Sequence, residues 1–218
     1  MRGPGETQLE TDRRMIRRKI STLRQRLEKV ARHRETIRRG RRSIPTFALV
    51  GYTNAGKSSL LKALTNKEVF VEDRLFATLD TLTREVFIPP NRSARLIDTV
   101  GFIRKLPHNL VASFRATLEE AANADVLLHV IDASHPDWEE HMEVVERVLT
   151  DLQLEDRAVI PVFNKIDRLE ESRGFVERVS ARFHPMACTS AAKGEVKQLR
   201  EVLAEETERF YAGGVRAV

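Results

Sequence analysis

The chain has 218 residues, of which 41% are hydrophobic and 32% are charged, and its formal net charge is +5 at pH 7. This length suits one domain of ordinary size with an appendage, and the hydrophobic share is enough for one substantial core. No apolar run is long enough for a membrane span, and the single cysteine, Cys188, excludes an intrachain disulfide and a cysteine metal cluster. We therefore expect a soluble, cytoplasmic protein.

Positive charge is concentrated in the N-terminal part of the chain. Residues 1–45 contain 15 Lys and Arg against 5 Asp and Glu, a net charge of +10, whereas residues 46–218 carry −5. A basic segment of this kind indicates either a polyanionic partner such as nucleic acid or a solvated helix face.

The N-terminal segment predicts a loop followed by one long helix. Residues 1–7 hold two glycines around a proline, which favours a turn. Between Gln8 and Arg39, apolar residues recur at helical spacings and form one narrow stripe, which favours pairing with a single partner helix. The partner could come from a second molecule, making the chain a parallel coiled-coil dimer, or from a segment outside this sequence. The stripe contains Leu9, Ile16, Ile20, Leu23, Leu27, Val30 and Ile37.

Apolar strands and amphipathic helices alternate from Thr46 onward, which is typical of an α/β sheet. The short turn at 89–91 predicts an antiparallel hairpin, and helical connections make the other strands parallel. We expect a six-stranded, mostly parallel sheet with one antiparallel edge strand, and ligands at the carboxyl ends of its strands. The predicted strands are 46–51, 84–89, 94–98, 125–132, 158–164 and 185–189, and the predicted helices are 57–66, 110–123, 137–152, 172–182 and 195–211.

The first predicted strand runs into the pattern Gly51-x-x-x-x-Gly56-Lys57-Ser58 and then into a helix. Backbone N–H groups of such a loop surround phosphate oxygens, and the helix points its positive end at them. Lys57 would reach the β- and γ-phosphates, and the Ser58 hydroxyl would bind Mg²⁺. The pattern predicts a nucleotide site that contains Gly51, Tyr52, Thr53, Asn54, Ala55, Gly56, Lys57, Ser58 and Ser59.

A second motif, Asp98-Thr99-Val100-Gly101, ends the third predicted strand. A carboxylate at this place can hold Mg²⁺ through water, and glycine lets its backbone N–H approach a γ-phosphate. Taken alone, Asp98 could equally be a capping residue. Its position one hairpin after the phosphate loop favours the role in the site.

The motif Asn164-Lys165-Ile166-Asp167 ends the fifth predicted strand. One carboxylate can accept hydrogen bonds from the ring N1–H and the exocyclic amine of guanine, and adenine presents no such pair. We assign this role to Asp167 and expect the stem of Lys165 to pack over the base, which selects GTP. After the sixth predicted strand, the turn at Thr189–Ala191 could donate a backbone N–H to the guanine carbonyl.

The segment 71–83 is irregular and rich in threonine. A switch loop needs one hydroxyl that binds Mg²⁺ only while the γ-phosphate is present. Thr78, Thr81 and Thr83 are all candidates, and their spacing alone does not rank them.

These motifs resemble, in the correct order, the G1, G3, G4 and G5 motifs of Ras-like P-loop GTPases. Residues 3–14, 51–58, 76–80 and 98–107 resemble more specifically the HflX family, of the Obg–HflX group. The resemblance implies that Thr78 is the switch threonine. It implies that Lys57, Thr78 and Gly101 are catalytic residues and that Ser58, Thr78 and Asp98 are metal ligands. It also implies that further residues bind the nucleotide together with the phosphate loop: Phe76, Ala77, Thr78, Leu79, Asp80, Asp98, Thr99, Val100, Gly101, Asn164, Lys165, Ile166, Asp167, Ser190, Ala191 and Ala192.

The resemblance also implies a partner and a domain organisation. Members of the family bind the ribosome, chiefly its large subunit and RNA, and several split stalled ribosomes after stress. Full-length members begin with a further domain and one more long helix, antiparallel to the one predicted here, and many continue into a C-terminal domain. We therefore expect residues 1–45 to be half of a helical hairpin, residues 46–218 to be the GTPase domain, and the chain to be a monomer whose stripe could self-associate.

Hydrolysis should be slow without stimulation. Many relatives place a glutamine after the glycine of the third motif to orient the attacking water, whereas this chain has Phe102, which cannot hydrogen-bond water. Asn54 occupies the position at which potassium-activated relatives hold a monovalent cation, so K⁺ could supply charge, unless Asn54 merely stabilises the turn. The alternative function is a nucleotide-gated RNA- or ribosome-binding module with negligible unstimulated hydrolysis.

Overall fold

The computed structural model describes residues 13–16, 44–65, 82–102, 121–154 and 157–213. The chain divides into two units, Met1–Ser43 and Ile44–Val218. In the first unit, residues 13–16 are helical, and the side chains of Met15 and Ile16 are exposed. The rest of the helix expected between Gln8 and Arg39 lies outside the described residues.

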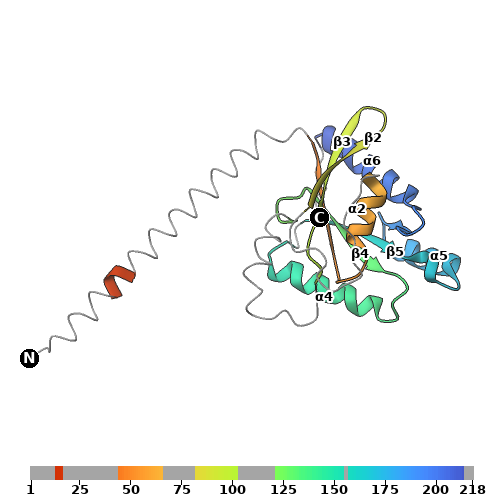
Figure 1. The fold of residues 1–218 in the computed structure, drawn as a ribbon, viewed down its shortest axis with the longest axis horizontal. Helices are drawn as coiled ribbons and strands as arrows, with labels where there is room; N and C mark the ends of the chain where they lie inside the picture. The colour runs from red at the N-terminus through yellow and green to blue at the C-terminus, as the bar shows by residue number, and fades with distance from the viewer. Residues whose placement is uncertain (1–12, 17–43, 66–81, 103–120, 155–156, 214–218) are drawn as a thin grey trace, which may run out of the picture. The chain divides into compact units, whose positions relative to one another are not determined.

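The second unit is built around a six-stranded sheet with the order β2-β3-β1-β4-β5-β6 (Figure 1). Its strands are β1 (Thr46–Gly51), β2 (Leu82–Ile88), β3 (Arg92–Asp98), β4 (Val126–Asp132), β5 (Ala158–Asn164) and β6 (Ala187–Cys188). Its helices are α2 (Lys57–Thr65), α4 (Trp138–Asp151), α5 (Ser172–Arg182) and α6 (Lys197–Tyr211), with the short 3₁₀ helix η1 (Ile166–Arg168) after β5. Within the described ranges, no helix combines the length and apolar character that a membrane crossing requires.

The strand directions confirm the expected mixed sheet. β2 and β3 pair antiparallel at one edge, and the pairs β1–β3, β1–β4, β4–β5 and β5–β6 are parallel. The hairpin is longer than predicted: β2 begins at Leu82 instead of 84, and β3 at Arg92 instead of 94. One face of β2 is exposed, so exposed and buried residues alternate along the strand. The first residues of the strand therefore do not form an apolar run, which is the pattern that the prediction used.

The sixth strand is shorter than predicted. β6 contains only Ala187 and Cys188, instead of 185–189. Beyond it the chain turns across the end of β5, and the Thr189 backbone N–H donates to the carbonyl of Phe163 at 2.8 Å. The loss of ladder pairing at this point brings the turn at 189–191 next to the end of β5.

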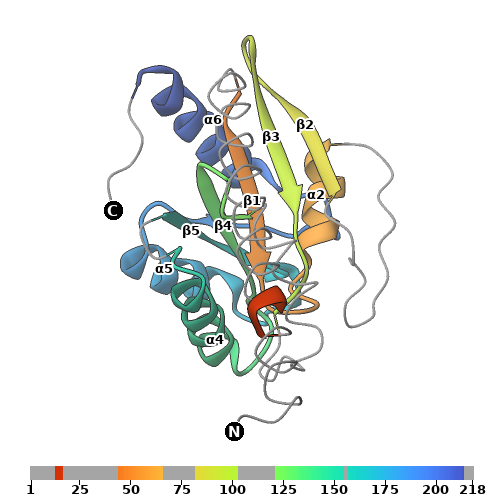
Figure 2. The same ribbon diagram turned by 90° about the vertical axis from the view of Figure 1, so that its left-hand side faces the viewer.

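Buried apolar residues cover both faces of the sheet. Side chains of α2 and α6 pack on one face against Phe47 and Leu49 of β1, and side chains of α4 and α5 pack on the other. Figure 2 shows these helices around the sheet. The alternation along β1 produces this division, since Ala48 and Val50 face the α4 side. The helix expected at 110–123 falls almost entirely outside the described residues; Ala121, near its end, is helical and buried.

Candidate nucleotide site

The loop between β1 and α2 requires its two glycines. Gly51 has φ 153°, and a Cβ there would lie 2.2 Å from the backbone oxygen of Val130 in β4. Gly56 has φ 96°, and a Cβ there would lie 2.3 Å from Nδ2 of Asn164. Real Cβ atoms do not approach other atoms this closely, and both φ values favour glycine. The loop is therefore held against β4 on one side and against the end of β5 on the other.

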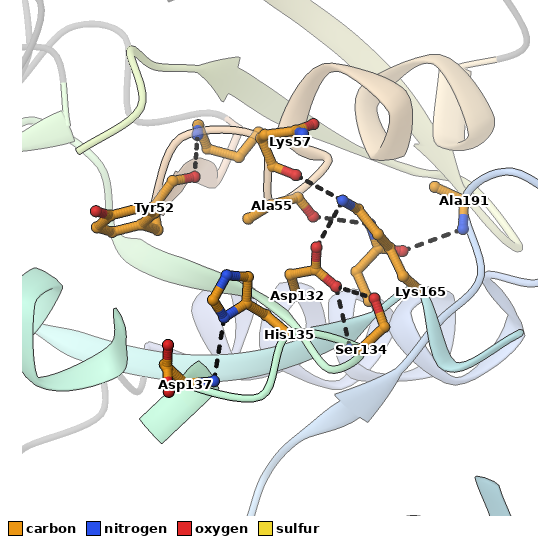
Figure 3. A network of polar contacts seen from close by, with 11 residues as sticks. Tyr52, Ala55, Lys57, Asp132, Ser134, His135, Asp137, Lys165 and Ala191 are labelled. Carbon is orange, nitrogen blue, oxygen red and sulfur yellow. Dashed lines mark hydrogen bonds and ion pairs between the residues drawn. The ribbon is translucent and has the colours of Figure 1, made fainter. Parts of the chain in front are cut away.

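Lys57 lies inside this loop. Its Nζ donates to the carbonyl oxygens of Gly51 at 3.2 Å and Tyr52 at 3.1 Å, and its side chain is buried (Figure 3). Burial lowers the pKa of Lys57 to about 8, and the nearby charge of Asp98 opposes that effect. Two carbonyls of the loop thus hold the Lys57 ammonium group inside the same loop that would surround a phosphate group.

Ser58 and Asp98 meet at the ends of neighbouring strands. β1 and β3 run parallel, so the start of α2 lies beside the end of β3. The Ser58 hydroxyl donates to Oδ2 of Asp98 at 2.5 Å, and the adjacent Thr99 hydroxyl donates to the carbonyl of Leu49 at 2.6 Å. The two expected metal ligands from these motifs are therefore brought together.

The backbone at Gly101 and Phe102 pairs with the loop. Phe102 N–H donates to the Gly51 carbonyl at 3.1 Å, and Thr53 N–H donates to the Phe102 carbonyl at 2.8 Å. A Cβ on Gly101 would lie 2.6 Å from Cα of Thr53 and 3.1 Å from Nζ of Lys57, so glycine is needed for close approach. The side chain of Phe102 is fully buried and packs in the core cluster that contains Val100.

Asn164 joins three motifs. Its Nδ2 donates to the Ala55 carbonyl at 2.9 Å, and its Oδ1 accepts from the Thr189 hydroxyl and the Ala191 N–H, both at 3.1 Å. The side chain is 1% exposed. A buried amide that satisfies donors and acceptors on three segments fixes their relative positions.

Asp167 and Lys165 are held by separate partners. The Ser190 hydroxyl donates to Oδ1 of Asp167 at 2.6 Å. Lys165 has a left-handed backbone, φ 63°, and its Nζ donates to the Asn54 carbonyl at 2.7 Å. The carboxylate is half-buried at the same strand ends as the phosphate loop, which is the arrangement that a bound nucleotide would span.

The remaining predicted residues fall in different places. Asn54 is exposed with φ 60°, and Ala192 is also exposed, whereas Thr53 and Ser59 are half-buried. Of the three threonine candidates, Thr83 lies in β2, paired with Ile97, and it is exposed at the sheet edge. Thr78 and Thr81 lie outside the described residues, as do Phe76, Ala77, Leu79 and Asp80.

Sequence reasoning missed two parts of the site. Asp132, the last residue of β4, forms an ion pair with Lys165 at 2.6 Å, and the rule that ligand sites form at carboxyl ends of strands could have found it. The ring of Tyr52 in the loop stacks on the ring of His141 in α4, with ring centroids 3.9 Å apart. The ring centroids of His135 and His141 are 4.3 Å apart. No local pattern signals this stack, because its rings come from separate segments.

Comparisons with known proteins identify the family of the chain. Residues 46–165 match a family described as "50S ribosome-binding GTPase", and residues 1–41 match "GTP-binding GTPase Middle Region". A curated relative, GTPase HflX of Magnetococcus marinus, is 53% identical over 195 residues, covering 88% of this chain and 45% of the relative. The chain belongs to the HflX family of GTPases. GTPase HflX of Escherichia coli is 45% identical over 94% of this chain, and the chain spans 49% of that relative.

Solved structures agree with the fold. The crystal structure titled "SsGBP and GDP complex" matches with a TM-score of 0.63 and 27% identity, covering 92% of this chain and 61% of that one. The six-stranded sheet is therefore the Ras-like P-loop fold expected for the HflX family. The chain spans about half the length of the curated HflX relatives it matches.

Proposed function

We propose that the chain binds guanine nucleotides, hydrolyses GTP slowly when alone, and acts on the ribosome. The observation that carries the proposal is the convergence of the Asn164–Asp167 motif on the phosphate loop. Asn164 joins the loop to the turn at 189–191, and Asp167 is held beside them by Ser190. The family of HflX GTPases and the GDP complex of a relative with the same fold support the same ligand.

The donor set at Ser58 and Asp98 fits Mg²⁺. Oγ of Ser58 and Oδ2 of Asp98 lie 2.5 Å apart. Both are hard oxygen ligands of the kind that Mg²⁺ takes beside phosphates. When bound, the ion would neutralise charge that develops on the phosphate oxygens during transfer. Thr78 remains the proposed third ligand. Lys57 would add a fixed positive charge to the β- and γ-phosphates from within the loop.

The burial of Phe102 supports slow unstimulated hydrolysis. Its backbone is tied to Gly51 and Thr53, and its ring lies in the core, so this side chain does not hold the attacking water. Gly101 precedes it and would offer a backbone N–H to the γ-phosphate. Charge stabilisation by Lys57 and loop N–H groups would then provide most of the catalysis, and a stimulating partner would have to position the water.

K⁺ activation through Asn54 is a further part of the proposal. The exposed side chain lies on the loop where it can reach a cation near the phosphates. Its left-handed φ of 60° also suits asparagine for purely conformational reasons. Turnover that is no faster in KCl than in NaCl would reject the cation role and leave the conformational one.

GTP turnover by the purified chain tests the enzymatic part. We expect phosphate release from GTP in the presence of Mg²⁺, none from ATP above background, and loss of the GTP signal in Lys57→Ala. A matched control is Glu139→Gln in α4, which removes an exposed ion pair with Arg182 of α5 and should leave turnover unchanged. Equal release from GTP and ATP, or full activity of Lys57→Ala, would contradict the proposal.

The alternative is a nucleotide-gated RNA- or ribosome-binding module, and the burial of Phe102 favours it over a fast enzyme. In that case the basic arm and the nucleotide state govern binding, and hydrolysis only resets the chain. Background-level turnover together with tight, nucleotide-dependent ribosome binding would select this alternative. Measurable turnover that rises when large subunits are added would select the stimulated GTPase.

A further inference from the structure

Asp132 occupies a central place in the site without belonging to any of its motifs. It is the last residue of β4 and pairs in register with Asn164, the last residue of β5. Its Oδ1 accepts from the backbone N–H of Ser134 at 3.1 Å and from the Ser134 hydroxyl at 2.6 Å. Its Oδ2 accepts from Nζ of Lys165 at 2.6 Å (Figure 3). Both carboxylate oxygens therefore accept hydrogen bonds, which fix the orientation of the Asp132 side chain.

Lys165 is held at its charged end by two acceptors. One is the Asp132 carboxylate and the other is the Asn54 carbonyl at 2.7 Å, and the lysine side chain is only 15% exposed. A lysine side chain has four rotatable bonds and loses much rotamer freedom when it is fixed. With its ammonium anchored at one end and a left-handed backbone at the other, the stem follows a defined path.

The charge on Asp132 is maintained in this setting. Burial alone would raise the pKa of Asp132, but the hydrogen bonds from Lys165 and Ser134 and the charge of Lys165 outweigh that effect and hold the pKa below its usual value. The carboxylate is therefore ionised at neutral pH. A charge-assisted hydrogen bond is stronger than a neutral one, so it is the firmer of the two anchors on Lys165.

We propose that Asp132 is a positioning residue for guanine binding, which fixes the ammonium group of Lys165 so that the lysine stem is already placed against the purine face. This inference rests on the proposed function, because it concerns how the same site holds its base. Preorganisation of this kind increases affinity by lowering the conformational entropy lost on binding. The Asn54 carbonyl alone would leave the stem free to rotate away from the base.

A double-mutant cycle with mant-GDP tests this proposal. Asp132→Ala should raise the Kd of mant-GDP about tenfold, the effect expected when one hydrogen bond to a charged group is lost. The increase should appear in the dissociation rate, since the encounter with nucleotide is unchanged. Lys165→Ala should weaken binding at least as much. The double variant should bind no more weakly than Lys165→Ala, because Asp132 acts through that lysine.

Two further variants separate positioning from general stability. Asp132→Asn retains the shape and an acceptor for Ser134 but loses the charge, so its Kd should lie between wild type and Asp132→Ala, and it serves if the alanine variant does not fold. Glu139→Gln removes an exposed ion pair between α4 and α5 and should leave the Kd unchanged. If Asp132 had a merely structural role, Asp132→Ala would lower the nucleotide-free Tm. It would also raise the Kd by the same factor in wild type and in Lys165→Ala.

Each outcome of the cycle decides a claim. Additive effects of Asp132→Ala and Lys165→Ala, or wild-type binding by Asp132→Ala, would overturn the positioning role while leaving the proposed function intact. A wild-type chain that binds no mant-GDP would overturn the proposed function, and this inference with it. Non-additivity with an unchanged nucleotide-free Tm would support both.

Discussion

His129 illustrates how strongly the surroundings act on a single residue in this sheet. It lies in β4 between Val50 of β1 and Pro161 of β5, and it is 2% exposed. Burial lowers the pKa of His129 from 6.5 to about 3, with a further contribution from the positive charge of Lys57. The imidazole is therefore neutral in the folded protein at any pH at which the protein would be used.

This depressed pKa predicts an acid sensitivity. Between pH 6.5 and about 3 the unfolded chain binds a proton at His129 that the folded chain does not, so the free energy of unfolding falls as pH falls. His129→Leu should remove roughly 3 kcal/mol of the loss at pH 4. Urea denaturation of both proteins between pH 4 and 8 measures it. Parallel stability curves for the two proteins would show that His129 does not titrate in this way.

Residue chemistry explains which site residues were predictable. Lys57, Asp98 and Asp167 were predicted because each motif has a known chemical task at a known spacing, and the structure brings their segments together. Asp132 was missed because a lone aspartate after an apolar run carries no spacing pattern. Its role becomes visible only when Lys165, from the next strand, is seen to bond with it.

At the scale of elements, a buried hydrogen bond joins the loop between β1 and α2 to the end of β5. The Asn164 amide bonds to the Ala55 carbonyl, and Gly56 leaves only enough room for that amide. A side chain at Gly56 would therefore disturb nucleotide binding and the contact with β5 together. The local sequence around the loop predicts its glycines, but not the partner that makes the second one necessary.

Gly56→Ala tests this coupling. Its Cβ would meet Asn164 Nδ2 at 2.3 Å in a backbone with φ 96°, so we expect the unfolding free energy to fall by about 1–3 kcal/mol and GDP affinity to fall at least tenfold. The matched control is Gly174→Ala in α5, where the added Cβ meets nothing closer than 4.0 Å. That variant should be as stable as wild type or more stable. Equal behaviour of the two variants in chemical denaturation and GDP titration would refute the coupling.

The elements themselves were predicted unevenly. The buried strands β1, β4 and β5 are apolar runs, and their prediction needed only hydrophobicity. The first two residues of β2 and of β3 were missed because that hairpin lies at the sheet edge with one exposed face. β6 was predicted too long at both ends: Pro185 and Met186 precede the strand, and Thr189 leaves the ladder, where its hydroxyl donates to Asn164, a contact that no local pattern encodes.

At the scale of the whole molecule, the charge division matters most for the proposed partner. Residues 1–45 carry +10 and residues 46–218 carry −5. A polyanion such as ribosomal RNA would attract the first segment and repel the second, so the arm should provide much of the binding. The chain spans about half the length of its curated relatives, so this prediction concerns binding by these residues alone.

Co-sedimentation with large ribosomal subunits tests this division of labour. We expect more of the chain to pellet with a non-hydrolysable GTP analogue than with GDP. Binding should weaken at least about tenfold between 50 and 200 mM salt, because contacts of basic side chains with phosphates release counterions. Binding that ignores both the nucleotide and the salt concentration would count against a ribosome-directed role for this chain.

The central claim, guanine specificity through Asp167, is tested most directly by equilibrium titration of wild type and Asp167→Asn with GDP, ADP and xanthosine diphosphate. Wild type should bind GDP at least about a hundredfold more tightly than the other two, since only guanine offers the carboxylate two donors. Asparagine would replace one acceptor with a donor, which fits the carbonyl of xanthine in place of the guanine amine. We expect Asp167→Asn to lose affinity for GDP and to gain affinity for xanthosine diphosphate. An unchanged preference for GDP in that variant, or equal binding of GDP and ADP by wild type, would refute guanine selection by Asp167.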